Sequence, residues 1–251
     1  MSAEKFTSPR RKLVRNFLRW LAKPVFHAVT DLEINGAENF PASGPLIMVG
    51  NHFSFVDPAS FVRVSPREIE FLGGAETPHA PKVSRILPYL WGYHPLYRGT
   101  GAKDSIRAAE GILKEGKVLA IFPEGGNWAT VLRPARPGTA FLAVKTGAPL
   151  LPVGLVNMPE VLPNLMRGRR ARIQVNIGKP FGPFIAEGRG QQLRDQLDEI
   201  GHEIMRRIAE LLPGESRGHY SEDPIIREAA KGTEIYPWAD KVEGQVIGVV
   251  R

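Results

Sequence analysis

Cysteine is absent from this chain of 251 residues, and long apolar runs are absent as well. Without a thiol, the protein has no disulfide, no thiolate metal site and no cysteine nucleophile. The longest apolar runs, such as residues 118–122 and 150–156, are much shorter than the roughly 18–20 residues that span a bilayer, so no transmembrane helix is expected. None of the expected strands ends in a Gly-x-Ser-x-Gly elbow, so covalent catalysis has no obvious nucleophile.

Positive charge is concentrated at the N-terminal end of the chain. The net charge is +7, and residues 1–30 hold seven Lys or Arg against one Glu. Between residues 11 and 30 the apolar residues recur every three or four positions, which predicts a helix with an apolar stripe and a basic face that includes Arg15 and Arg19. Such a helix can lie in the headgroup layer of an anionic membrane, so we interpret residues 1–30 as a basic amphipathic membrane-associating helix.

An alternative for this helix is that its apolar stripe packs on the protein core and its charges are merely solvated. Nucleic acid is not an expected partner, because no RNP, zinc-finger or helix-turn-helix pattern accompanies the basic run.

Short apolar runs alternate with helical patterns along the middle of the chain. The runs expected to form strands are residues 45–49, 69–72, 93–97, 118–122, 150–156 and 172–177. The helical patterns cover residues 105–113, 139–145 and 191–212. This alternation predicts a single α/β domain, residues 31–212, with a mixed, largely parallel sheet flanked by helices. Residues 213–251 lack clear periodicity and are expected to form a partly ordered C-terminal tail.

A histidine and an aspartate stand directly after the first of these strands, in the sequence NHFSFVDP of residues 51–58. An aspartate that accepts a hydrogen bond from one imidazole nitrogen fixes the tautomer and leaves the other nitrogen free to take a proton from a hydroxyl. His52 is therefore a candidate general base, with Asp57 as its orienting partner. Because Asp57 precedes Pro58 at an expected helix start, it is a candidate helix cap as well.

Two further strands end in residues that suit an anionic ligand. The strand over 118–122 runs into Pro-Glu-Gly-Gly, where backbone N–H groups can face an anion and Glu124 can position a hydroxyl. The strand over 93–97 is followed by Arg98, whose guanidinium suits a phosphate. Glycine turns and surface arginines also occur without a ligand. The joint occurrence of the blocks is therefore a more specific indication of function than any single block.

The His-x4-Asp block, the strand-arginine block, the Phe-Pro-Glu-Gly block and a Leu-Pro-Val-Gly block at 151–154 follow one another in this order. In that order and spacing, residues 30–180 resemble the 1-acylglycerol-3-phosphate (lysophospholipid) acyltransferase family. The resemblance implies transfer of a fatty acyl group from acyl-CoA or acyl carrier protein to a hydroxyl of a lysophosphatidate-type acceptor. It places this step of phospholipid biosynthesis at the cytoplasmic face of the membrane, with the acyl donor as co-substrate and with no cofactor or metal.

The resemblance also implies roles for individual residues. His52 corresponds to the base, Asp57 to its partner, and Pro152 to a residue that shapes the acyl-donor side. The residues implied to bind the acceptor, typically at its phosphate, are Arg98, Glu124 and Gly125. Since no nucleophile is evident, the implied chemistry is direct attack of the acceptor hydroxyl on the thioester while His52 takes the proton. Backbone N–H groups near the start of the helix after Asp57 are expected to hold the oxyanion.

One block departs from the family pattern. The family usually continues Glu-Gly-Thr-Arg-Ser, whereas this chain has Gly-Asn-Trp at 126–128 after its Glu-Gly. Either Arg133 or Arg136 reaches back to a phosphate, or the acceptor lacks a phosphomonoester, as a glycolipid does. A thioesterase in which His52 activates water and a catalytically silent lipid-binding protein are the other open alternatives. The arginines between 167 and 172 are either solvated or form a second patch for lipid or CoA phosphate.

Overall fold

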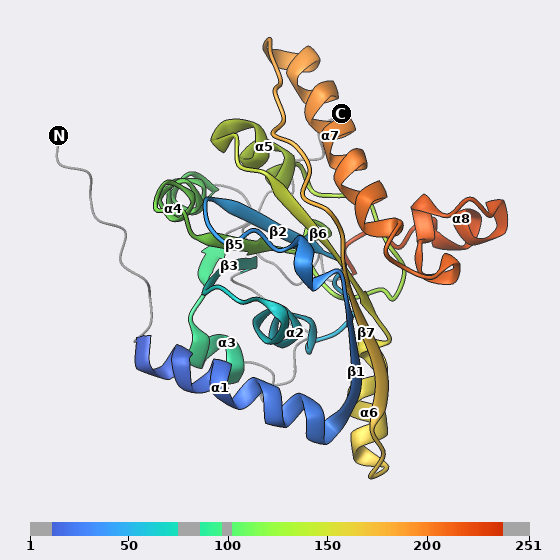
Figure 1. Cartoon of the computed structure of the whole chain (residues 1–251). Coiled ribbons are helices and arrows are strands. Elements are labelled where there is room, and N and C mark those ends of the chain that lie inside the picture. The colour runs from blue at the N-terminus through green and yellow to red at the C-terminus, as the bar shows by residue number, and fades with distance from the viewer. Residues whose placement is uncertain (1–11, 75–85, 97–101, 238–251) are drawn as a thin grey trace.

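A mixed β-sheet forms the centre of the molecule, with helices on both of its faces (Figure 1). The computed structural model describes residues 12–74, 86–96 and 102–237. In these residues the strands are β1 (Thr30–Asn35), β2 (Leu46–Gly50), β3 (Ile69–Gly74), β4 (His94–Leu96), β5 (Val118–Ile121), β6 (Leu150–Val156) and β7 (Ala171–Ile177). They lie in the order β1-β7-β6-β2-β5-β3-β4, and all neighbours are parallel except β6 and β7. This confirms the single α/β domain with a mixed, largely parallel sheet.

Helices cover the sheet because its central strands are apolar on both faces. The helices of the described residues are α1 (Lys12–Val29), α2 (Asp57–Val64), α3 (Ile86–Trp91), α4 (Ala102–Lys114), α5 (Pro137–Thr146), α6 (Val161–Met166), α7 (Gly190–Ala209) and α8 (Pro224–Ala230). Along β2, Ile47 and Val49 pack with α4, α5 and α7, whereas Leu46 and Met48 pack with residues of α1, α2 and α3. Strands buried on both faces have continuous apolar runs, which is why β2, β5 and β6 were recognisable from sequence.

The strand β1 was missed by the sequence analysis, which assigned no strand before residue 45. It pairs in parallel with β7 at the edge of the sheet. Its signal is the alternation of polar residues with Leu32 and Ile34, whose side chains are half-buried while those of Asp31, Glu33 and Asn35 are exposed. Alternation over six residues is typical of a half-buried edge strand.

Residues 213–237 form regular structure where the sequence analysis expected part of a tail. They contain the 3₁₀ turns η4 (Gly214–Ser216) and η5 (Gly218–Tyr220) before α8. The N–H of Leu132 donates to the carbonyl of Ser216 (3.0 Å), and the N–H of His219 donates to the carbonyl of Leu132 (3.1 Å). The segment is thereby joined to the loop that follows β5. The domain boundaries at residues 30 and 212 stay predictions.

Gly218 allows this close approach and gives a test of it. Its φ is 48°, and a Cβ there would overlap the carbonyl oxygen of Leu132. The substitution Gly218→Ala is expected to lower the free energy of unfolding by about 1–3 kcal/mol, because a non-glycine residue is strained in this conformation and must displace Leu132. Urea unfolding measures the change. Gly214→Ala is the matched control in the same segment, because a Cβ there meets nothing within 4 Å; an equal loss in both variants would contradict the argument.

Helix α1 is present as predicted, but its orientation corrects the sequence interpretation. Arg15, assigned to the basic face of the helix, is completely buried. Its guanidinium forms a bidentate pair with Glu70 of β3 at 2.6 and 2.9 Å, and its Nε donates to the carbonyl of Trp91 at 2.9 Å. Conversely, part of the apolar stripe faces outward: Leu13 is 81% exposed, Phe17 56% and Trp20 70%. The pair with Glu70 and the packing of Leu18 and Phe26 on the core together hold this side of α1 against the protein.

A helix crosses a bilayer only if it is both long and apolar enough. None of the described helices combines the length and the apolarity that crossing a bilayer requires.

Candidate active site

His52 and Asp57 are held together by the turn that leads from β2 into α2. The Nδ1 atom of His52 lies 2.9 Å from Oδ2 of Asp57. The same carboxylate oxygen accepts the backbone N–H groups of Phe53 and Ser54, each at 2.7 Å. Asp57 is fully buried as the first residue of α2. The carboxylate thus shapes the turn and orients the imidazole ring, as the sequence analysis expected of this pair.

The other imidazole nitrogen is available for chemistry. Nε2 of His52 has no hydrogen-bond partner among the residues that the structure describes, and the His52 side chain is 17% exposed. The ring stacks on Phe122 with a centroid distance of 4.2 Å, and Phe122 stacks on Phe61 of α2. One face of the ring is therefore covered, and its position is set by packing as well as by Asp57.

Three backbone N–H groups of the turn before Asp57 are already in use. Phe53 and Ser54 donate theirs to Asp57, and the N–H of Val56 donates to the Ser54 hydroxyl. These three N–H groups are therefore not available to an oxyanion, and the expectation that N–H groups near the start of the helix after Asp57 hold it stays a prediction.

Gly50 and Asn51 fix the end of β2, and the sequence analysis gave neither a role. A Cβ on Gly50 would lie 2.7 Å from Phe61 and 2.8 Å from the carbonyl oxygen of Val153, so only glycine lets α2 pack this closely. The buried Asn51 side chain accepts the N–H of Leu155 (2.7 Å) and donates to its carbonyl (2.9 Å). A polar residue at the end of an apolar strand is the signal that could have identified Asn51 as a link between strands.

Glu124 lies against the backbone of His52 and is completely enclosed. Its Oε1 accepts the N–H of His52 at 2.8 Å, and its Oε2 accepts from Nε of Arg133 at 2.9 Å and from the backbone N–H of Arg133 at 3.2 Å. Arg133 also donates to the carbonyl of Gly126, and its guanidinium stacks 3.9 Å above the Trp128 ring. Both carboxylate oxygens of Glu124 therefore accept hydrogen bonds from the protein itself. Arg133, which the sequence analysis considered as one of two possible phosphate ligands, is paired with Glu124 instead.

The carboxyl pKa values on both sides of His52 are perturbed. Burial raises the pKa of Asp57, although the hydrogen bond and charge of His52 and the N–H groups of Ser54 and Phe53 oppose that rise. Burial also raises the pKa of Glu124 to about 7, and the Arg133 charge and the His52 N–H offset this only in part. Perturbed carboxyls flanking a histidine are typical of functional sites.

The loop after β5 is held by the C-terminal segment. Gly125 has a left-handed backbone (φ 76°) that turns the chain immediately after Glu124. The indole N–H of Trp128 donates to the carbonyl of Thr233 at 2.7 Å, and its ring makes an edge contact with Tyr236. Arg136 donates to the carbonyl of Glu234 at 3.3 Å. The segment 213–237 thus fixes the loop that carries Glu124 and Arg133.

Arg98 and Pro152 are the two other sequence-predicted residues. Arg98 lies outside the described residues. Pro152 is buried within β6, where it pairs with Val49, three residues before His52. The structure therefore brings together His52, Asp57, Glu124 and Gly125, and places Pro152 inside the sheet.

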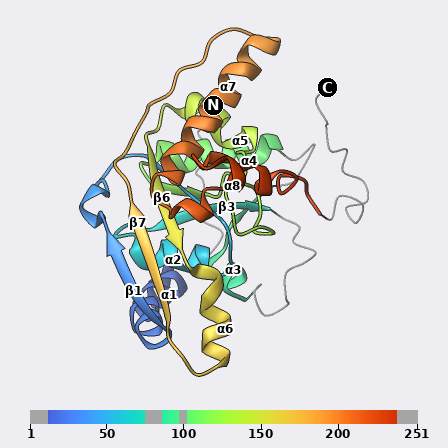
Figure 2. The same ribbon diagram turned by 90° about the vertical axis from the view of Figure 1, so that its right-hand side faces the viewer.

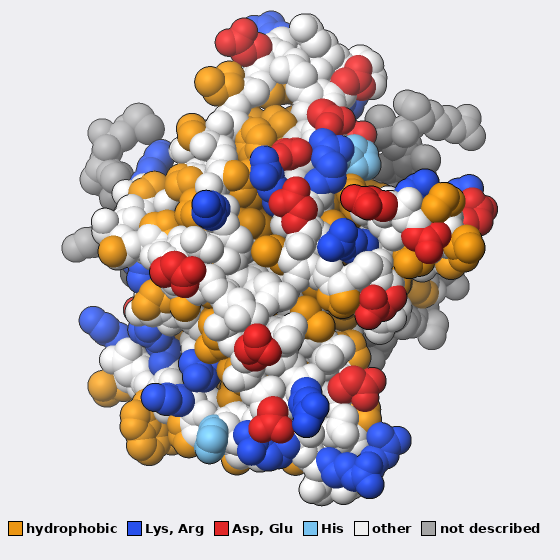
Figure 3. Space-filling model, turned by 45° about the vertical axis from the view of Figure 1, so that its right-hand side comes forward, with side chains coloured by type: hydrophobic (Ala, Val, Ile, Leu, Met, Phe, Trp, Pro, Cys, Tyr) orange, Lys and Arg blue, Asp and Glu red, His pale blue; other side chains and the backbone are white. Residues whose placement is uncertain are grey.

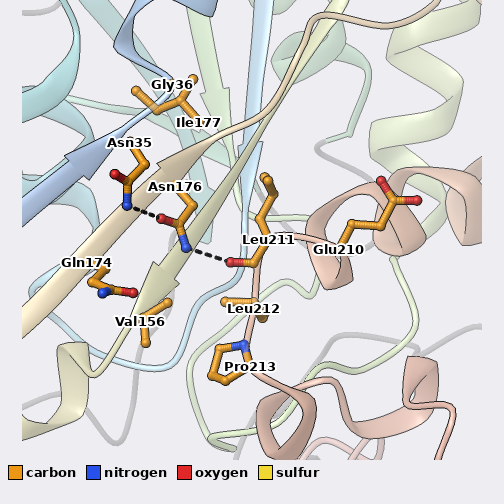
Figure 4. Close-up of a pocket in the computed structure, with 10 residues that line it drawn as sticks. All are labelled: Asn35, Gly36, Val156, Gln174, Asn176, Ile177, Glu210, Leu211, Leu212 and Pro213. Carbon is orange, nitrogen blue, oxygen red and sulfur yellow. Dashed lines mark hydrogen bonds between the residues drawn. The ribbon is translucent and has the colours of Figure 1, made fainter.

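A hollow of about 440 Å³ lies elsewhere, between the edge of the sheet and the end of α7. Figure 4 shows Asn35 donating to Asn176, and Asn176 donating to the carbonyl of Leu211, at 2.9 and 2.8 Å. These amides join β1, β7 and the chain after α7, so they have a structural role. In the part of the chain that the structure describes, no group of three or more His, Asp or Glu is placed to hold a metal ion.

Residues 214–218 read Gly-Glu-Ser-Arg-Gly and fit the pattern of a serine nucleophile elbow. The structure places them in the 3₁₀ turns after α7 and not between a strand and a helix. His219 lies 3.2 Å from Glu234, but no hydrogen bond joins the Ser216 hydroxyl to His219 in the described residues. The pattern therefore carries no catalytic geometry.

The segment that carries these site residues matches a known protein family. A family model described as Acyltransferase matches residues 31–156, half of the chain. The chain belongs to the Acyltransferase family. This match contains the His52 turn, Glu124 and Gly125, and it confirms the family resemblance read from the motif order.

Individual proteins of this kind are similar to the chain over different lengths. A 1-acyl-sn-glycerol-3-phosphate acyltransferase of Borreliella burgdorferi is 29% identical over 127 residues, 49% of this chain and 50% of that protein. The chloroplastic 1-acyl-sn-glycerol-3-phosphate acyltransferase BAT2 of Brassica napus is 26% identical over 182 residues, 70% of this chain and 52% of that protein. The chain spans about half the length of these curated relatives.

A solved structure supports the fold. The 1-acyl-sn-glycerophosphate (LPA) acyltransferase PlsC from Thermotoga maritima superposes with a TM-score of 0.53 at 24% identity, covering 77% of this chain and 79% of that one. The Acyltransferase family member described here therefore shares its architecture.

Proposed function

We propose that the protein transfers a fatty acyl group from acyl-CoA or acyl carrier protein to a hydroxyl of a lysophosphatidate-type acceptor. The observation that carries the proposal is the His52–Asp57 pair, in which Asp57 occupies Nδ1 and leaves Nε2 without a partner in the described residues. An imidazole oriented in this way is suited to accept a proton from a hydroxyl. Membership of the Acyltransferase family and relatives named 1-acyl-sn-glycerol-3-phosphate acyltransferases support the reaction type.

In the proposed reaction the acceptor oxygen attacks the thioester carbonyl carbon while Nε2 of His52 takes the hydroxyl proton. The tetrahedral intermediate collapses with cleavage of the carbon–sulfur bond. The thiolate leaves, and the proton on His52 neutralises it, so the imidazole is restored. Asp57 stabilises the imidazolium that forms in between. No covalent acyl-enzyme is needed.

Glu124 is proposed as a positioning residue. One of its oxygens holds the His52 backbone and the other holds Arg133, so it links the two strand ends of the site. This replaces the direct acceptor contact that the family resemblance implies for Glu124. Arg98 remains the proposed phosphate ligand, and Pro152 the proposed residue of the acyl-donor side.

A second candidate is an acceptor without a phosphomonoester. The two arginines that were candidates to replace the missing motif arginine are both engaged within the protein. Arg133 is 1% exposed and paired with Glu124, and Arg136 donates to the carbonyl of Glu234. Arg133 is therefore enclosed and not accessible to a phosphate, and the exposed Arg136 is already engaged by the Glu234 carbonyl.

One assay separates these possibilities: thiol release from a long-chain acyl-CoA, with lysophosphatidate, a monoacylated glycolipid or no acceptor. Release that depends on lysophosphatidate supports the main proposal, and release that depends on the glycolipid supports the second candidate. Release without any acceptor would identify a thioesterase instead. Absence of release with acyl-CoA and also with acyl carrier protein would contradict the enzyme proposal.

We also propose that α1 binds the cytoplasmic face of a membrane from its outer side. Leu13, Phe17 and Trp20 form an exposed apolar row, and the exposed residues Lys12 and Lys23 stand at its flanks. Apolar side chains that enter the boundary of the acyl region, next to lysines that attract anionic lipids, are typical of interfacial helices. The outward row is thus the part of the apolar stripe that is free to enter a membrane surface.

The variant Phe17→Glu/Trp20→Glu is expected to lower partitioning onto anionic vesicles about tenfold or more, because two aromatic anchors are replaced by charges that anionic lipids repel. Flotation with phosphatidylglycerol-containing vesicles measures it. Ile225→Glu, at an exposed isoleucine of α8, is the control. Equal binding of wild type and the α1 variant would reject α1 as the anchor.

A further inference from the structure

A second surface with lipid-binding chemistry lies at α6 and the residues that follow it, 161–170, which we call the α6 tip. Val161 anchors the helix in the core, but Leu162 is 49% exposed, Leu165 47% and Met166 88%. Three exposed apolar side chains on a helix of six residues are too many for an ordinary solvated turn. Their exposure requires an explanation beyond the packing of the domain.

Arginines follow this apolar group directly. Arg167 and Arg169 are exposed, and neither side chain has a hydrogen bond or ion pair with any residue that the structure describes. Arg170 instead donates to the carbonyl of Thr30 at 2.6 Å and pairs with Asp31 at 2.8 Å. It thereby joins the α6 tip to the junction of α1 and β1. The chemistry of the tip, apolar side chains bordered by two unpaired guanidinium groups, matches the acyl and phosphate layers of an anionic membrane.

The topology places the α6 tip at the edge of the sheet that carries His52. The strands β2, β5 and β6 are parallel, so their carboxyl ends share one edge. His52 follows β2, and α6 follows β6 through the turn η3 (Met158–Glu160). The hydroxyl of Ser60 in α2 lies 3.3 Å from the sulfur of Met158, which connects the two chain segments.

The figures show the same arrangement from outside. Helices α1 and α6 lie at the lower end of the molecule in two views at right angles (Figures 1 and 2). On the face in Figure 3, Lys and Arg side chains gather at that lower end beside exposed hydrophobic ones. α1 and the α6 tip therefore point toward one common boundary.

We propose that the α6 tip is a second membrane contact, in which Leu165 and Met166 enter the boundary of the acyl region and Arg167 and Arg169 pair with lipid phosphates. This inference rests on the proposed membrane function. Contact through α1 alone leaves the protein free to rotate about the helix axis. Contact through α1 and the α6 tip together fixes the rotation, so that the edge with His52 faces the lipid from which the acceptor comes.

The test uses the full-length protein and flotation with vesicles of phosphatidylcholine and phosphatidylglycerol. Arg167→Gln/Arg169→Gln is expected to lower the partition coefficient about 10- to 30-fold at low salt, since each basic residue at an anionic surface contributes about 1 kcal/mol. Leu165→Glu/Met166→Glu is expected to lower it at high salt as well, because the apolar contact is not screened. Ile225→Glu is the matched control.

The outcomes separate this inference from the membrane proposal. If wild type does not float with the vesicles, the membrane proposal and this inference both fail. If wild type and the α6-tip variants float equally while the α1 variant does not, only this inference is overturned. It is also overturned if sedimentation shows a dimer that the α6-tip variants abolish while vesicle binding is unchanged, because the tip is then an interface between copies.

Activity provides a second readout. With an acceptor embedded in vesicles, the α6-tip variants are expected to lose activity in proportion to binding. With the acceptor dispersed in detergent they are expected to keep the wild-type kcat, because the tip does not touch His52. Loss of activity in detergent would show a structural defect at the site and contradict an orienting role.

Discussion

Replacement of His52 by alanine is expected to lower kcat for acyl transfer about 10²–10⁴-fold, the contribution typical of a positioned general base. The substitution removes the imidazole whose Nδ1 is held by Asp57 and whose Nε2 is available to the acceptor hydroxyl. The fold is expected to persist, because the His52 side chain is partly exposed and the turn is shaped by Asp57 and backbone N–H groups. Acceptor-dependent thiol release measures the loss.

Two further variants sharpen this result. Asp57→Asn keeps an oxygen for the backbone N–H groups but removes the charge that stabilises the imidazolium, so its kcat is expected between those of wild type and His52→Ala. His202→Ala is the control. The imidazole of His202 in α7 is hydrogen-bonded to the hydroxyl of Tyr220 in η5 and not to Asp57. Turnover in His52→Ala equal to wild type would eliminate His52 as the base.

Replacement of Arg15 by alanine is expected to lower the free energy of unfolding by about 3–5 kcal/mol, because it leaves the carboxylate of Glu70 buried without its guanidinium partner. Arg15 and Glu70 are both buried and joined by two hydrogen bonds, and Arg15 also binds Glu68 at 3.0 Å. Urea unfolding measures the change. The control is Arg107→Ala, whose ion pair with Asp104 is exposed and is expected to be worth less than about 1 kcal/mol.

The same network predicts how stability responds to acid. Burial disfavours the charge of Glu70, but the hydrogen bonds from His94 and Arg15 and the charge of Arg15 outweigh it and lower the pKa of Glu70 to about 2. A carboxyl whose pKa is lower in the folded state stabilises the protein above its unfolded pKa, about 4.5, and this stabilisation is lost as pH falls toward 2. In Arg15→Ala this part of the acid dependence is expected to shrink; an unchanged acid profile would contradict the assignment.

The elements that sequence predicted well are those whose signal is local. The continuous apolar runs of β2, β5 and β6 reflect burial on both faces, and α7 has an apolar stripe at helical spacing. His52 and Asp57 are five residues apart, so one turn brings them together. The edge strand β1 was missed because its alternation is short and half of its side chains are polar.

Contacts between distant segments could not be predicted from the sequence. Arg15 looked like one of several solvated basic residues, yet it pairs with Glu70, 55 positions away. Trp128 meets the carbonyl of Thr233, 105 positions away, and this contact makes residues 213–237 part of the support for the Glu124 loop. Such pairings follow from the order of strands in the sheet and from which helix face is covered, and no local period encodes either.

By itself the sequence determined the α/β class, the family and the His52–Asp57 pair, because local periodicity, strand burial and a five-residue turn are properties of neighbouring residues. The tertiary structure alone decided that Glu124 is enclosed by His52 and Arg133, that α1 turns Arg15 inward and its aromatic residues outward, and that the α6 tip shares an edge with His52. The physical reason is that the free energy of a buried charge depends on the partner that the fold supplies, wherever that partner lies in the chain.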